Sequence, residues 1–141
     1  MTSKFSVFVM ILYIILAVGM IAKADEEAEQ QALEAAEQWL DLVDTGNYAE
    51  SWEEAAEYFK SAVQKMQWQQ TIKAIREPLG GVQSRDATWW QYTTSLPGAP
   101  DGEYVVIQFT TVFENKSSAV ETVTPMLDQD GRWRVSGYYI K

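Results

Sequence analysis

Two arginines and two tryptophans surround the point at which the chain is expected to change from helix to strand. Arg76 and Arg85 lie on either side of residues 78–81 (Pro-Leu-Gly-Gly), and Trp68 and Trp89 lie close to them in the sequence. A guanidinium group beside an aromatic face can hold an anionic or planar ligand. Irregular backbone beside a rigid scaffold is where binding residues tend to gather. The sequence therefore predicts a ligand-binding site formed by these four side chains.

The same arginines have a simpler interpretation, in which each one pairs with a carboxylate of its own chain. Glu77, Asp86 and Glu121 are the candidate partners. The domain is strongly acidic and repels anions in general, so an anionic ligand would depend on local attraction from Arg76 and Arg85. A neutral aromatic ligand stacked on tryptophan is an equally reasonable occupant of the site.

Catalytic residues are scarce in this sequence. It contains no histidine and no cysteine, which removes the commonest general base and excludes Ser-His-Asp and Cys/His catalysis. We therefore expect no catalytic residue, and a non-catalytic binding or interaction module is the preferred function. The alternative is an enzyme in which a buried Asp, Glu or Tyr acts as general base in an apolar cavity. Glu121, between Ala119 and Val123, is the obvious strand carboxylate, but its burial cannot be predicted.

Neither a metal nor a cofactor is expected. Zinc and copper sites without histidine or cysteine would have to consist of carboxylates alone, which these metals seldom accept. Residues 128–131 (Asp-Gln-Asp-Gly) resemble part of a calcium loop, but Met126 and Gly137 would then occupy its first and last ligand positions. Gly80 and Gly81 lack the lysine and serine of a phosphate-binding loop.

Acidic residues crowd the segment 25–57, which contains twelve of them and no basic residue. One interpretation is an acidic platform for a basic partner or for divalent ions, and the simpler one is a solvated helix face that keeps the protein soluble. The net charge of the chain is −9. Binding to nucleic acid or to an anionic membrane needs a basic surface, so we expect neither.

The spacing of apolar residues in the first half of the chain predicts three helices. Apolar residues recur every three or four positions, and glycine, asparagine and proline mark the ends of the segments. The segments are 26–43, 47–59 and 63–75. In the third segment, Met66 and Ile75 are expected to belong to the apolar face.

Alternation of apolar and polar residues in the second half predicts four strands, 88–95, 104–113, 119–127 and 132–140. Short turns between them favour antiparallel neighbours. The predicted fold class is therefore α+β, with three N-terminal helices packed on one face of a four-stranded antiparallel meander. The expected face assignments concern three strands. Ile107 and Phe109 face the helices while Tyr104 and Gln108 face away, Tyr139 shares a face with Trp133 and Val135, and the adjacent Trp89 and Trp90 point to opposite faces.

The N-terminus has the pattern of a secretory signal peptide. Lys4 supplies a positive charge, residues 5–21 are apolar apart from one serine, and residues 22–24 read Ala-Lys-Ala before the acidic 25–27. This order of charge, apolar run and small-residue site predicts cleavage after Ala24. The alternative is an uncleaved membrane anchor, because a spanning helix needs about 20 apolar residues.

Cleavage would divide the chain into a signal peptide, residues 1–24, and a single domain, residues 25–141. The loss of Lys4 and Lys23 would change the net charge from −9 to −11. The domain would act in the periplasm or outside the cell and would not contact the membrane after the signal is removed. A mature domain without cysteine has no disulfides, so apolar packing must stabilise it.

Five blocks of the chain follow one another as they do in a known family. They are 39–48 (WLDLVDTGNY), 51–56 (SWEEAA), 76–80 (REPLG), 96–104 (LPGAPDGEY) and 133–140 (WRVSGYYI). On these blocks the chain resembles the domain of unknown function 4019 family. The resemblance implies a bacterial envelope protein with an NTF2-like or cystatin-like fold, and it implies no reaction and no functional residues. It leaves open whether the partner is a small ligand or an envelope protein, whether an NTF2-like enzyme is the better description, and the oligomeric state.

Overall fold

A computed structural model describes the backbone of residues 3–141 and the side chains of residues 19–141. Lys4 and most of the predicted signal peptide lie outside the part whose side chains are described. The elements are α1 (Ser3–Asp44), α2 (Tyr48–Glu53), α3 (Glu57–Ala62), α4 (Lys65–Arg76), a short 3₁₀ helix η1 (Glu77–Leu79), β1 (Val82–Thr93), β2 (Tyr104–Phe113), β3 (Lys116–Leu127) and β4 (Trp133–Ile140).

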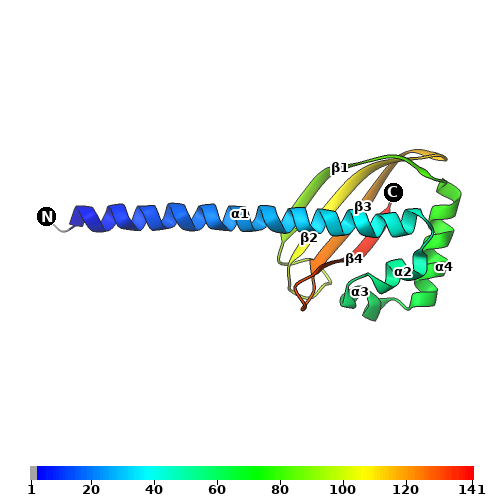
Figure 1. Cartoon of the computed structure of the whole chain (residues 1–141), viewed down its shortest axis with the longest axis horizontal. Helices are drawn as coiled ribbons and strands as arrows, with labels where there is room; N and C mark the ends of the chain where they lie inside the picture. Colours follow the sequence, from blue (N-terminus) through cyan, green and yellow to red (C-terminus); the bar gives the residue numbers. More distant parts are fainter. Residues whose placement is uncertain (1–2) are drawn as a thin grey trace.

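The four strands form one antiparallel sheet in the order β1-β2-β3-β4, as expected for a meander. The sheet curves around the C-terminal half of α1, and the three shorter helices lie together at one end of it (Figure 1). The predicted α+β class is confirmed. A core of buried side chains lies between the sheet and the helices and includes Ala32, Ala36, Trp39, Leu40, Val43, Phe59, Trp68, Ile72, Val105, Ile107, Phe109, Val123 and Val135.

The first helix is longer than the predicted 26–43, because α1 begins at Ser3. Residues 21–26 contain neither proline nor glycine, so nothing in them interrupts the helical hydrogen bonds. The N-terminal part of α1 extends beyond the sheet (Figure 1). In the part of the chain whose side chains are described, no helix is long and apolar enough to cross a membrane.

The second predicted helix, 47–59, is in fact two short helices, α2 and α3. The break occurs at Ala56, whose backbone is extended and whose N–H donates to the carbonyl oxygen of Val135 on β4, 2.8 Å away. This bond replaces a helical one and ties the α2–α3 junction to the sheet. The described chain therefore has four α-helices rather than the three predicted.

The buried face of α4 differs from the prediction. Trp68, Ile72 and Arg76 are buried, whereas Met66 and Ile75 are 71% and 41% exposed. Residues four apart lie on one face of a helix, so the three buried residues form a single row that ends in a charged side chain. A prediction from apolar residues alone could not include Arg76, and for this reason the predicted buried face of α4 was wrong.

β2 has the predicted bounds and face, since Ile107 and Phe109 are buried at 0% and 1% exposure. Tyr104 lies on the opposite face, as predicted, but it is also buried, and its hydroxyl donates to the carbonyl oxygen of Pro100 at 2.5 Å. The loop between β1 and β2 therefore covers this tyrosine. Gln108 is only partly exposed on the outer face.

Two β-bulges change which residues of the edge strands face the helices. In β1 the register shifts between Ala87 and Trp89, so that Trp89 pairs with outward-facing Gln108 and Trp90 pairs with inward-facing Ile107. In β4 the register with β3 shifts between Gly137, which pairs with Thr124, and Val135, which pairs with Pro125. This shift turns the side chain of Tyr138 toward the helices. Tyr139, predicted to face the helices, is instead 51% exposed.

Candidate functional site: a buried charge cluster

Six polar side chains from six different elements meet beneath the sheet, at the junction between helices and strands. They are Asp44, Arg76, Arg85, Thr111, Glu121 and Tyr138. Asp44 and Arg76 are the last residues of α1 and α4. The other four stand on the inner face of β1, β2, β3 and β4, where Arg85 is directly opposite Thr111.

Asp44 binds both arginines. Arg85 donates to it with two nitrogens, Nη1 to Oδ2 at 2.6 Å and Nη2 to Oδ1 at 2.9 Å, and Arg76 Nη2 donates to Oδ1 at 2.6 Å. A two-point contact of this kind is the strongest geometry of an arginine–carboxylate pair. It also satisfies an anion at the C-terminus of a helix, where the helix dipole disfavours negative charge.

Glu121 is fully buried and accepts three hydrogen bonds. Arg85 Nε and Thr111 Oγ1 donate to Oε1 at 2.8 and 2.5 Å, and the hydroxyl of Tyr138 donates to Oε2 at 2.5 Å. Arg76 Nη1 lies 4.0 Å from Oε2. Both carboxylate oxygens are therefore occupied, and the two acids and two arginines leave the cluster without net charge.

Burial and pairing oppose each other in the protonation of this cluster. Burial alone raises the pKa of Asp44, but hydrogen bonds from Arg85 and Arg76 outweigh burial and hold that pKa below 3.8. Burial lowers the pKa of Arg85, but its bonds to Asp44 and Glu121 raise that pKa by more than burial lowers it. Arg85 therefore stays charged. Burial and the nearby Glu121 raise the pKa of Tyr138 well above 10. Tyr138 is therefore a poor base at neutral pH.

Arg76 is the least satisfied member of the cluster. Its side chain is 4% exposed, and its Nε and Nη1 atoms have no hydrogen-bond partner. The guanidinium carbon lies 4.9 Å from the centre of the Phe113 ring, a distance typical of a cation–π contact. The aromatic face thus supplies part of the attraction that hydrogen bonds do not.

The junction beside the cluster is closed by backbone contacts. Asn115 N–H donates to the carbonyl oxygen of Leu79, and Glu114 N–H donates to that of Gly81, both at 2.9 Å. Gly80 has φ +72, and a side chain there would come within 2.9 Å of Glu114 Cβ. The irregular segment is therefore fixed to the β2–β3 turn, where only glycine fits this conformation.

The family match covers the whole of this cluster. A family described as protein of unknown function (DUF4019) matches residues 35–138. The chain belongs to this family. No curated protein matches the chain. All six cluster residues lie within the matched part, which ends at Tyr138.

The four site residues predicted from the sequence lie in three separate places in this DUF4019 protein. Arg76 and Arg85 meet, but their charges face Asp44 and Glu121, so the alternative of internal pairing describes them. Trp68 belongs to the core, where its ring stacks edge-on against Phe59 at 4.9 Å. Trp89 is 45% exposed on the outer face of the sheet, away from the other three.

Sequence reasoning missed Asp44, Thr111 and Tyr138. Asp44 lies four residues after buried Leu40 on the same helix face, and Thr111 lies between two buried phenylalanines, so strict periodicity marks both as inward-facing. Tyr138 had no such signal, because the bulge in β4 reverses the alternation. Of the three predicted carboxylate partners, Glu121 is the one that pairs; Glu77 lies 3.8 Å from Lys73 instead.

Grooves in the described surface lie away from the charge cluster. One, of about 240 Å³, lies between α1, α2 and the start of β4; we call it the α1–β4 groove, and it is lined by Ala35, Gln38, Trp39, Leu42, Glu54, Arg132, Trp133, Arg134 and Val135. A second, of about 660 Å³, lies beside Leu33 and the 46% exposed Trp90. A third, of about 690 Å³, adjoins the first and shares Glu54, Arg132 and Arg134 with it. Within the described residues, no group of three or more acidic side chains is placed to hold a metal ion.

Proposed function

We propose that this DUF4019 protein is an exported, non-catalytic binding or interaction module. In this proposal the signal peptide is cleaved after Ala24, and the domain from Asp25 onward acts in the periplasm or outside the cell. The sheet that curves around a long helix (Figure 1) supports the NTF2-like or cystatin-like relationship that the resemblance implies.

One observation carries the non-catalytic part of the proposal: the groups best suited to chemistry are used up by one another. Both oxygens of Glu121 accept hydrogen bonds, and the arginines beside it face carboxylates. None of the three grooves is lined by a residue of the charge cluster. A general base must reach the proton that it removes, and Glu121 is fully buried and lines none of these three grooves.

Two tryptophans that are at least partly exposed on grooves support binding instead. Trp90 stands beside the second groove, and Trp133 lines the α1–β4 groove. Large aromatic side chains next to a few polar groups are the usual lining of a ligand site. The buried Glu121 is the one observation that favours the alternative, an enzyme of the NTF2-like kind.

Two measurements test the proposal. Mass spectrometry of protein from the envelope fraction should find a chain that begins at Asp25. A chain that stays in the cytoplasm with residues 1–24 attached would refute export. A panel of hydrolysis and isomerisation substrates should show no turnover, and turnover that disappears in Glu121→Gln while the fold survives would establish the enzyme alternative.

A further inference from the structure

The α1–β4 groove is lined by two opposite charges, Glu54 and Arg132, neither of which forms a direct ion pair with another described side chain. Glu54 immediately follows α2, and Arg132 immediately precedes β4. In the part of the chain that the structure describes, Glu54 and Arg132 form hydrogen bonds only through backbone atoms, and Asp130 attracts Arg132 without a direct side-chain bond. The neighbouring Arg134 differs, because Asp130 and Asp128 hold it at 2.7 and 3.0 Å.

The floor of the groove is apolar and aromatic. Trp39 is almost fully buried and Trp133 is partly exposed, and Leu42, Ala35 and Val135 complete the lining. The volume of about 240 Å³ is smaller than the roughly 300 Å³ at which sites for drug-sized molecules begin. The groove therefore suits a molecule with one ring or a branched apolar group.

The walls of the groove are fixed to one another by hydrogen bonds. The indole N–H of Trp39 on α1 donates to the carbonyl oxygen of Ser51 on α2 at 2.8 Å. The N–H of Ala56, two residues after Glu54, donates to the carbonyl oxygen of Val135 on β4 at 2.8 Å. Rigid walls reduce the entropy lost when a ligand binds, so the apolar part of the groove is held in shape before a ligand arrives.

We propose that the α1–β4 groove binds a small zwitterion, namely a free amino acid with an apolar or aromatic side chain. Arg132 receives the α-carboxylate, Glu54 receives the α-ammonium group, and the side chain lies over Trp133. A simple anion fits less well, because the adjoining groove adds Glu53, Glu57 and several aspartates. This inference rests on the binding function proposed above and specifies its ligand class.

Calorimetric titration of the mature domain with L-phenylalanine tests the inference. Saturable binding is expected, and 3-phenylpropionate and phenethylamine, which each lack one of the two charges, should bind at least about tenfold more weakly. Arg132→Gln and Glu54→Gln should each weaken phenylalanine binding by a similar factor. Nuclear magnetic resonance should show that the indole N–H signal of Trp133 shifts as phenylalanine is added.

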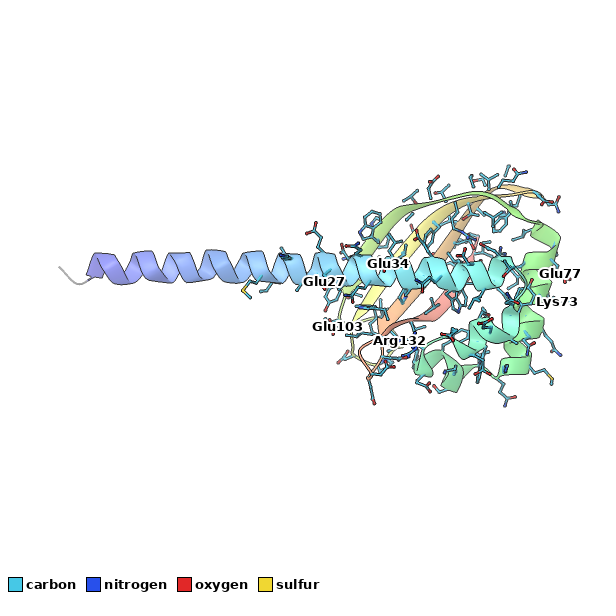
Figure 2. The ribbon with its side chains drawn as sticks, in the orientation of Figure 1. Glu27, Glu34, Lys73, Glu77, Glu103 and Arg132 are labelled. Carbon is cyan, nitrogen blue, oxygen red and sulfur yellow. The ribbon has the colours of Figure 1, made fainter. Side chains whose placement is uncertain are left out.

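The matched controls are Lys73→Gln and Glu77→Gln, which remove the same charges from an exposed pair on and after α4. Figure 2 shows this pair at the end of the domain away from Arg132. Both controls should bind phenylalanine as the wild type does. Absence of saturable binding at about 10 mM phenylalanine, or equal affinity in all four variants, would overturn the assignment.

The inference and the proposed function fail in different ways. A wrong ligand class leaves phenylalanine unbound or indifferent to Arg132 and Glu54, and it leaves export and the absence of turnover unchanged. A wrong function appears instead as cytoplasmic retention or as turnover abolished by Glu121→Gln.

Discussion

Replacement of Asp44 by asparagine removes the carboxylate that both buried arginines share. The negative charge and one of the two acceptor oxygens are lost, and Arg76 and Arg85, whose side chains are 4% and 13% exposed, keep their charges. Removal of one partner of a buried ion pair typically costs about 3–5 kcal/mol, because the remaining charge is left without compensation in a medium that solvates it poorly. Since domains of this size unfold with about 5–15 kcal/mol, Asp44→Asn should lose a large share of the stability.

Urea unfolding followed by tryptophan fluorescence measures this loss. With a denaturant slope of about 1–3 kcal/mol per molar urea, the midpoint should fall by roughly 2 M. Asp130→Asn is the matched control, since Asp130 also receives two nitrogens of an arginine, Arg134, but is 52% exposed. Solvent screens that pair, and its loss should hardly move the midpoint. Equal shifts in the two variants would refute the view that burial makes the Asp44 pairs important.

Three further outcomes are expected. Hydrogen bonds from Arg85 and Arg76 outweigh burial and lower the pKa of Asp44 in the folded protein below 3.8. Ionised Asp44 therefore stabilises the fold fully above pH 3.8, and this stabilisation is lost as the pH falls through the lowered folded-state pKa. In acid titrations below pH 3.8, the stability of Asp44→Asn should depend less on pH than that of the wild type. Phe109→Ala should reduce the free energy of unfolding by about 3–5 kcal/mol, and Gln108→Ala by about 0.5 kcal/mol or less, in urea titrations; equal losses would mean that the face assignment of β2 is wrong. Edman sequencing of exported protein should read from Asp25, and an N-terminus at Met1 would contradict cleavage.

The elements that could be predicted are those whose pattern is local. The alternation in 104–113 depends only on neighbouring residues, and β2 has these bounds. The break between α2 and α3 could not be predicted in the same way, because Ala56 is extended by a bond to Val135, far away in the sequence. The bulges in β1 and β4 are likewise set by pairing between strands, and so Tyr138 and Tyr139 exchanged faces relative to the prediction.

The location of the candidate site and one partner, Glu121, could be predicted, but the other carboxylate partner, Asp44, could not. Pro78 and the following glycines marked the junction where Arg76 and Arg85 meet. Asp44, in contrast, is one of twelve acidic residues in 25–57, and charge alone does not distinguish it from the other eleven. Asp44 is distinguished only by its position on the apolar face of the helix. A prediction that uses apolar residues alone leaves charged residues out, so it does not find Asp44.

The neutrality of the charge cluster has a consequence for the rest of the surface. Two arginines face two carboxylates inside the domain, so the whole excess of negative charge lies outside the cluster. Most charged side chains that line the second and third grooves are acidic, so a positive charge without a direct ion pair gains importance near them. Arg132 forms no direct ion pair among the described residues, and it lines the α1–β4 groove together with Trp133 and Glu54. Specific binding is expected where opposite charges, an aromatic floor and rigid walls coincide, and this groove combines all three.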